Sequence, residues 1–226
     1  MATWIAHLRV AEKLLEKFDF LDVQSFLVGN IGPDSGVPNE DWSEFSPPKV
    51  ISHWYSEAGG IDAEDFKVKY LSDTSKYTNK EKSFYLGYYT HLLSDIEWGV
   101  LAKIKLGDPV CKDRLEKEPK FIWVIKDDWY GQDHLYLRDN KQSVFYKEFI
   151  KINEFHNTYF DFYPPEAFTR QVNYITDFYL NFNENLDRDF VYLSKEEMDK
   201  YVENTSEAIT NVLYSLIQTK AEKVGV

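Results

Sequence analysis

A long helix expected over residues 79–106 most constrains how this chain can fold. Thr78 and Glu81 form a capping box, in which each side chain accepts a hydrogen bond from the other residue's backbone N–H. The segment ends at Gly107-Asp108-Pro109, because glycine favours a helix end and proline cannot continue the helix. A helix of this length spans about 40 Å. Shorter elements must pack along it to bury its apolar side chains.

The rest of the chain also has the periodicity of helices. Apolar residues recur at spacings of three and four, whereas alternation with a period of two is scarce. The expected helical segments are 4–18, 23–31, 62–71, 121–137, 141–155, 165–180 and 194–222, the last opened by a capping box of Ser194 and Glu197. We therefore predict an all-α fold. The length of 226 residues, with 43% hydrophobic content, predicts a single domain over residues 1–226.

Composition and charge argue against several classes of function. The net charge of −12 disfavours binding to duplex nucleic acid, which requires a basic surface. The single cysteine, Cys111, excludes an intramolecular disulfide framework and a cysteine-rich metal site. No apolar run has the length of a transmembrane segment, and the first residues lack the pattern of a secretion signal. We therefore expect a cytoplasmic protein, and the sequence leaves its oligomeric state open.

A long connection rich in glycine, proline and aromatic residues follows the second expected helix. Gly32-Pro33-Asp34 stops regular structure and puts Asp34 on a turn. Residues 35–60 are then expected to form an ordered loop, a common location for functional residues. The aromatic residues expected to hold this loop are Trp42, Phe45 and Trp54.

His91 and Asp95 lie four residues apart in the long helix, so their side chains share one face. An imidazole and a carboxylate at this spacing suit zinc or a similar divalent metal. Taken alone, the pattern is also typical of a solvated helical pair. The same face carries Phe84, Tyr88, Leu92 and Trp98. Because an unpaired aspartate among such residues is costly, a cation is the simplest compensation.

Gly87 lies one turn before His91. A glycine inside a helix costs about 1 kcal/mol relative to alanine, so its presence predicts the close approach of another element. The first helix and the loop of residues 31–54 are both candidates for that element.

His7, Asp34 and His53 are further candidate ligands in the first quarter of the chain. Each also has an ordinary structural explanation: His7 as a core histidine, Asp34 as a turn residue and His53 as a loop histidine packed on tryptophan. Beside a helical pair that favours a cation, coordination explains all three together. The sequence thus predicts one metal site made of His7, Asp34, His53, His91 and Asp95.

Four segments carry these residues: Ala6-His7-Leu8-Arg9-Val10-Ala11, residues 26–34, Ser52-His53-Trp54 and residues 86–95. In order and spacing they resemble the bacterial zinc-dependent phospholipase C family, whose fold is shared more distantly with single-strand-specific zinc nucleases. The likeness covers roughly the first half of the chain. Beyond Trp98 the chain resembles uncharacterised bacterial members of the group rather than the secreted enzymes.

The resemblance implies an all-helical fold around a zinc cluster. In that cluster Asp34, His53, His91 and Asp95 would bind one ion, Asp95 would bridge to another, and His7 would bind this second ion. Asp34 would also orient or deprotonate the attacking water. Two ions about 3.5–4 Å apart can stabilise the attacking and leaving oxygens of a phosphoester.

The chain departs from the secreted enzymes in two places. Those enzymes use the mature amino terminus as a ligand, whereas Met1-Ala2-Thr3 precede Trp4 here. They also supply histidine and glutamate ligands soon after the His–Asp motif, whereas residues 96–110 contain no histidine. The resemblance therefore implies one or two ions, with zinc expected and manganese or iron left open. Additional ligands could come from Asp127, Asp128, Asp133 or His134, for which a solvated helix face is the alternative.

Two functions fit these residues. The first is a zinc-dependent hydrolase of phosphoric esters, with a small phosphodiester or phosphomonoester as substrate. The second is a non-catalytic helical module, in which a structural metal supports an aromatic surface that binds a partner. A catalytic site keeps an open coordination position, whereas a structural site is closed by protein ligands. A helical protein without metal fits least, because it would leave buried carboxylates uncompensated.

Overall fold

The computed structural model describes residues 1–41, 43–183 and 185–224, with side chains up to residue 217. Its longer helices are α1 (Trp4–Leu15), α2 (Val23–Ile31), α4 (Ala63–Leu71), α5 (Asn79–Leu106), α6 (Pro109–Lys117), α7 (Phe121–Asp139), α9 (Ala167–Leu180) and α10 (Lys195–Val224). Shorter elements are η1 (Gly32–Asp34), β1 (Val37–Pro38), β2 (Phe45–Ser46), α3 (Lys49–Ser52), α8 (Val144–Lys147) and η2 (Phe149–Lys151). The prediction of an all-α fold is confirmed.

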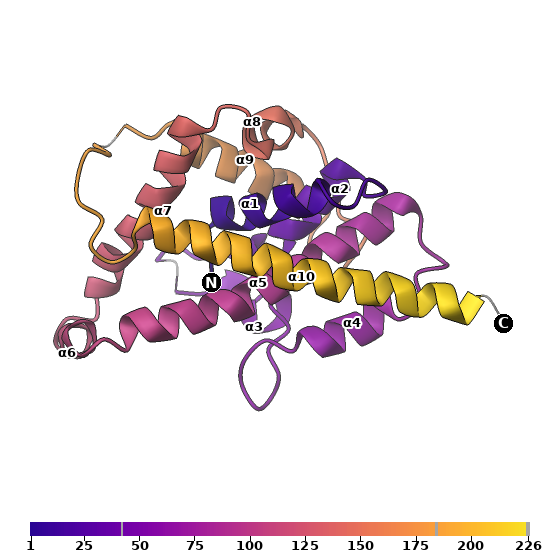
Figure 1. Cartoon of the computed structure of the whole chain (residues 1–226), viewed down its shortest axis with the longest axis horizontal. Helices are drawn as coiled ribbons and strands as arrows, with labels where there is room; N and C mark the ends of the chain where they lie inside the picture. Colours follow the sequence, from indigo (N-terminus) through magenta and orange to yellow (C-terminus); the bar gives the residue numbers. More distant parts are fainter. Residues whose placement is uncertain (42, 184, 225–226) are drawn as a thin grey trace.

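Helix α5 lies at the centre of this arrangement, and α10 crosses over α1 and α5 (Figure 1). The predicted bounds of α5 are confirmed, and so is its capping box. The Thr78 backbone N–H donates to the Glu81 carboxylate at 2.8 Å, and the Glu81 backbone N–H donates to the Thr78 hydroxyl at 3.2 Å. The buried hydrophobic side chains, many of them aromatic, form one cluster around this helix.

Helices α2 and α5 touch through their backbones. A Cβ atom on Gly87 would lie 2.2 Å from the carbonyl oxygen of Phe26, and one on Gly29 would lie 2.1 Å from that of Phe84. Both positions therefore require glycine. The close approach predicted at Gly87 is confirmed, but the approaching element is α2. Neither the first helix nor the loop of residues 31–54 fills that gap.

The helix expected over 141–155 differs in the structure because distant side chains bind its backbone. Instead of one helix over 141–155, the chain forms α8 and η2 and then extends. The Glu12 carboxylate accepts a hydrogen bond from the Val144 backbone N–H, and the Thr169 hydroxyl bonds both backbone groups of Phe155. Gly107-Asp108-Pro109 ends α5 as predicted, but Asp108 also caps α6 by accepting from the N–H groups that follow it.

The loop of residues 35–60 is ordered by the small β1–β2 ribbon and by α3. Trp54 packs edge-on against Phe66 and Tyr70, as expected for a residue that holds the loop to the core. The Phe45 ring lies 4.5 Å from the ammonium of Lys49. Trp42 lies outside the described residues.

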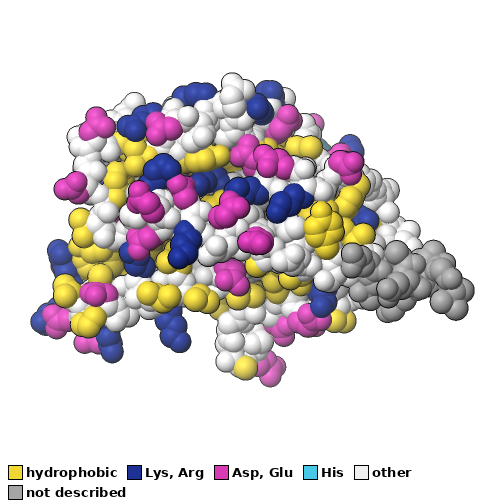
Figure 2. All heavy atoms as spheres, in the orientation of Figure 1, with side chains coloured by type: hydrophobic (Ala, Val, Ile, Leu, Met, Phe, Trp, Pro, Cys, Tyr) yellow, Lys and Arg dark blue, Asp and Glu magenta, His cyan; other side chains and the backbone are white. Residues whose placement is uncertain are grey.

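The surface carries acidic and basic side chains side by side, as the face in Figure 2 shows. On this face, side chains of both charges are intermixed. Among the described helices, none combines the length and apolar composition that a membrane crossing requires.

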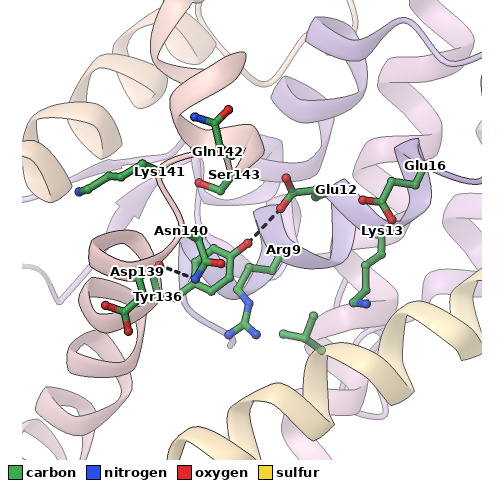
Figure 3. Close-up of a pocket in the computed structure, with 11 residues that line it drawn as sticks. Arg9, Glu12, Lys13, Glu16, Tyr136, Asp139, Asn140, Lys141, Gln142 and Ser143 are labelled. Atoms are coloured by element: carbon green, nitrogen blue, oxygen red, sulfur yellow. Dashed lines mark hydrogen bonds between the residues drawn. The ribbon is translucent and has the colours of Figure 1, made fainter.

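A cleft of about 560 Å³ lies between α1, the end of α7 and α10 (Figure 3). Several of its charged side chains have partners within the fold. The Glu12 carboxylate accepts from the Tyr136 hydroxyl at 3.0 Å, and Arg9 pairs with Asp199 while its guanidinium lies over the Tyr136 ring. None of the candidate site residues lines the cleft. We therefore regard the cleft as a polar interface between packed helices.

Candidate metal centre

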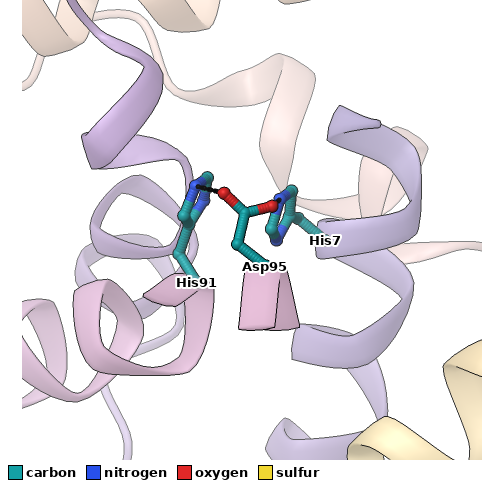
Figure 4. A group of neighbouring side chains, drawn as sticks. All are labelled: His7, His91 and Asp95. Atoms are coloured by element: carbon teal, nitrogen blue, oxygen red, sulfur yellow. Dashed lines mark ion pairs between the residues drawn. The ribbon is translucent and has the colours of Figure 1, made fainter. Parts of the chain in front are cut away.

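The five residues predicted to form one site come from four elements and converge. His7 lies on α1, Asp34 ends η1, His53 follows α3, and His91 with Asp95 lies on α5. Figure 4 shows the Asp95 carboxylate directed at the rings of His7 and His91, with one oxygen toward each. Its two oxygens lie 3.4 Å from the Nε2 atoms of His7 and His91, and 3.6 Å separates the second oxygen from Nε2 of His53. His53 Nε2 in turn lies 3.4 Å from an Asp34 oxygen.

The centre is deeply buried. The side chains of His7, His53 and His91 have no exposed surface, and that of Asp95 is 1% exposed. Asp34 is the most accessible of the five, at 8%. The interior of the site is thus closed by packing, and Asp34 marks the side nearest to solvent.

Several polar atoms of the centre have no hydrogen-bond partner in the part of the chain that the structure describes. They are both ring nitrogens of His7, Nε2 of His53, Nε2 of His91 and one oxygen of Asp95. Buried polar atoms of this kind are costly when unsatisfied. Two sets of potential ligand atoms lie within 4.8 Å of one another: His7, His91 and Asp95, and Asp34, His53 and His91. Imidazole nitrogens and carboxylate oxygens fit a divalent ion such as zinc.

Hydrogen bonds fix the orientation of these side chains. Nδ1 of His91 donates to the backbone carbonyl of Asn30 at 2.7 Å, which leaves Nε2 free as a ligand atom. Nδ1 of His53 lies 3.0 Å from the Ser52 hydroxyl, and its Nε2 likewise points toward the carboxylates. Asn30 lies at the end of α2, so the contact between α2 and α5 sets the ring of His91.

The environment favours ligand-ready protonation states at two of the ligands. Burial and the neighbouring His91 lower the pKa of His7 to about 4, so its ring is neutral near pH 7. Burial raises the pKa of Asp95, but the adjacent His91 and His7 outweigh it and hold the pKa well below its ordinary value. A neutral imidazole and a carboxylate are the forms that coordinate a metal.

Asp34 has a similar balance with additional partners. Burial raises its pKa, whereas the hydrogen bond with His53 and the charges of His91, His53 and Lys49 together lower it below the ordinary range. One of its oxygens accepts from the Trp4 indole N–H at 3.1 Å, and the other lies 3.9 Å from the Lys49 ammonium. Asp34 is therefore ionised and held in place.

The amino-terminal residues reach the centre even though Met1 to Thr3 precede Trp4. The backbone N–H of Ala2 donates to an oxygen of Asp95 at 2.7 Å. The start of the chain thus covers the site beside α1.

The candidates for additional ligands on α7 have other partners. Asp128 and Asp127 pair with Arg188, and Asp128 also accepts from the backbone N–H of Tyr192. None of the residues proposed on α7 belongs to the ligand sets found among the described residues.

Asp133 and His134 are also engaged elsewhere. Asp133 accepts from the hydroxyls of Thr3 and Tyr179, and the His134 ring stacks on Phe182. Because Asp128, Asp133 and His134 are buried, the alternative of a solvated helix face does not describe them either. The side chains of Asp128, Asp133 and His134 therefore connect α7 to other elements of the fold.

Sequence reasoning missed residues at the accessible edge of the centre. Lys49 stands four residues before His53, a spacing that could have suggested a shared turn. Trp4 contacts Asp34 and packs edge-on against Tyr174 and Phe178 from α9. No local pattern signals that second contact, because α9 is distant in the sequence.

Comparison of the chain with protein-family models, curated proteins and solved structures gives no match. The likeness to zinc-dependent phospholipases C therefore rests on the four motif segments alone. The convergence of the five residues stands independently of it.

Proposed function

We propose that this protein is a metal-dependent hydrolase of phosphoric esters, with one or two divalent ions, zinc first among them. The observation that carries the proposal is the convergence of three buried histidines and two aspartates, in which the Nε2 atoms of all three histidines and one oxygen of Asp95 have no hydrogen-bond partner among the described residues. An arrangement so costly in a dry interior is explained by a cation that satisfies these atoms.

The ligands fall into two overlapping groups. His7, His91 and Asp95 would hold one ion. Asp34, His53 and His91 could bind a second ion, or could bind the same ion at an alternative position. Asp95 contacts all three histidines and is therefore the residue on which both positions depend. A divalent ion at this centre supplies Lewis acidity, which makes water more acidic and offsets phosphoryl charge.

Asp34 is the residue we assign to the attacking water. It is ionised, it is the most exposed member of the centre, and Trp4 and His53 hold its two oxygens. From that position its carboxylate would accept a hydrogen bond from water and then the proton that water loses on attacking phosphorus. The P–O bond to the alcohol would break in this step, and the alcohol would leave with a proton from Asp34 or from solvent. The substrate we propose is a small phosphoric ester rather than duplex nucleic acid, because the acidic chain disfavours a long polyanion. We further propose a cytoplasmic location, on the basis of the single cysteine.

The decisive experiment measures metal content and hydrolysis together. Protein purified without added metal is analysed for zinc, manganese and iron, and is assayed with p-nitrophenyl phosphate and bis(p-nitrophenyl) phosphate. We expect about one or two ions per chain and turnover of at least one substrate. Absence of metal both in this sample and in protein reloaded with each ion would refute the proposal.

Near-complete burial of the three histidines also supports a second candidate function, a non-catalytic module with a structural metal site. Partner binding would then use exposed aromatic side chains such as Trp123, Tyr174 and Phe178. Spectroscopy of the cobalt-substituted protein separates the two functions. Added phosphate alters the cobalt spectrum if a coordination position is open, and leaves it unchanged if four protein ligands close the site.

A further inference from the structure

Lys49 lies at the accessible side of the metal centre, and the charge of a second lysine, Lys126, acts on the same group, in a chain whose net charge is −12. The Lys49 ammonium is 3.9 Å from an oxygen of Asp34, and the Lys49 side chain is 35% exposed. Lys49 comes from α3, four residues before His53. Lys126 comes from α7, and its charge interacts with those of Lys49 and Asp34. The charges of both lysines thus act on the Asp34 carboxylate, and Lys49 contacts it directly.

The surroundings of Lys126 disfavour its positive charge. Burial and the charge of Lys49 lower its pKa, and only the Asp34 charge acts in the opposite direction. Its ammonium lies 4.7 Å from the centre of the Trp123 ring, and among the described residues no carboxylate pairs with it. A partly desolvated cation that is repelled by another cation is stabilised when an anion binds near both of them.

The single negative charge of Asp34 cannot neutralise both lysines and a metal ion at the same time. It is a candidate ligand and lies 3.4 Å from His53, while its contact with Lys49 is at the limit of an ion pair. When the Asp34 charge is engaged by a cation at the centre, the two ammonium groups are left to attract another anion. A phosphoryl group bound at the centre would supply that anion.

Phosphomonoesters and phosphodiesters differ in the negative charge that they carry near neutral pH. A phosphomonoester carries about 1.5 to 2 negative charges at pH 7, whereas a diester carries one. Two ammonium groups whose charges act on the same carboxylate match the larger charge, because lysine binds phosphate as a compact point charge. The second ester group of a diester would also have to fit beside the lysine side chains.

We infer that Lys49 and Lys126 form an anion subsite that makes phosphomonoesters the preferred substrates of this centre. This inference rests on the proposed function for its catalytic consequence, but the subsite itself can be tested by binding alone.

The first test titrates inorganic phosphate into the metal-loaded protein by calorimetry. The variants are Lys49→Met, Lys126→Met and the corresponding Lys→Arg changes, and Lys80→Met at an exposed position of α5 is the matched control. Each methionine variant is expected to weaken phosphate binding about tenfold. The arginine variants should retain most of the affinity, and the control should match the parent. Elemental analysis should find the same metal content in all of them.

The second test compares kcat/KM for p-nitrophenyl phosphate and bis(p-nitrophenyl) phosphate. The parent should favour the monoester, and the methionine variants should lose more of their monoester activity than of their diester activity. Unchanged phosphate affinity in both methionine variants would overturn the inference even if hydrolysis is intact. Lysine-dependent phosphate binding without any hydrolysis would instead refute the proposed catalytic function and leave the subsite standing.

Discussion

The imidazole rings of His7 and His91 lie face to face, with centroids 3.8 Å apart and planes 6° from parallel. Two protonated rings would repel each other at this distance, and burial with the neighbouring His91 lowers the pKa of His7 to about 4. Neither ring nitrogen of this neutral His7 has a hydrogen-bond partner in the described part of the chain, and Nε2 lies 3.4 Å from the Asp95 carboxylate, an arrangement suited to binding a cation. The predictions below test that organisation and the fold that maintains it.

Replacement of the central carboxylate should remove the metal. Asp95→Asn keeps the shape of the side chain but loses the charge that contacts His7, His53 and His91. We expect its metal affinity to fall by more than about tenfold. Elemental analysis after dialysis against metal-free buffer measures this. Glu97→Gln, an exposed change two residues along the same helix, is the control and should retain full occupancy. Equal metal content in the two variants would mean that Asp95 is not a ligand.

Zinc should stabilise the folded protein, because the folded state assembles ligands that the unfolded chain keeps apart. At a free zinc concentration 100 times the dissociation constant, the free energy of unfolding rises by about 2.7 kcal/mol. For a chain of this size the melting temperature should rise by roughly 5–10 °C. Differential scanning calorimetry with zinc and with a chelator measures the shift. A shift of the same size in Asp95→Asn would assign the effect to some other site.

Alanine at Gly87 should destabilise the protein by about 1–3 kcal/mol or more, because its Cβ would lie 2.2 Å from the Phe26 carbonyl oxygen. Separation of α2 from α5 should also loosen the bond between Asn30 and His91, and so weaken metal binding. Urea unfolding measures the first effect and a zinc titration the second. Gly99→Ala is a matched control on the same helix, since among the described residues nothing outside its own stretch of helix lies within 4 Å of its Cβ position. That variant should be as stable as the parent, or about 1 kcal/mol more stable. Similar losses in both variants would contradict the role of the α2–α5 contact.

The buried Asp133 should make stability depend on pH. Burial raises its pKa to about 7, even though Tyr179 and Thr3 donate hydrogen bonds to it. Between about pH 4 and pH 7 the folded state binds the proton that the unfolded state has released. The free energy of unfolding should therefore fall as pH rises through this window, by up to about 4 kcal/mol.

The variant Asp133→Asn isolates this effect, because an amide does not titrate. Urea unfolding of the metal-free parent and variant at a series of pH values is the measurement. The parent should lose stability relative to the variant as pH rises from about 4 to about 7. Parallel pH curves for the two proteins would show that Asp133 ionises in the folded state as it does in the unfolded chain.

Local rules account for what could be predicted from the sequence. The capping box of Thr78 and Glu81 involves residues three apart, and the bounds of α5 follow from it and from the glycine and proline that end the helix. The pairing of His91 with Asp95 follows from the helical repeat in the same way. A glycine inside a helix indicated a close approach at Gly87, but the absence of a side chain does not specify which element fills the gap.

Contacts between distant segments account for what could not be predicted. The break within 141–155 depends on Glu12 and Thr169, which lie in other helices and satisfy backbone groups that an isolated segment would pair within itself. The burial of Asp133 under Tyr179 likewise depends on how α9 packs against α7. Helical periodicity carries no information about such partners.

The sequence by itself determined that the chain is helical, where its central helix begins and ends, and which five side chains could share an ion. Tertiary structure alone decided that α2 rather than α1 lies against Gly87, that Asp128 and Asp133 serve the fold, and that Lys126 comes close enough to act on Asp34. The physical reason is the separation along the chain over which each kind of interaction acts. Capping and helical spacing act over a few residues, whereas packing and unscreened charge in a dry interior act between segments that only the complete fold brings together.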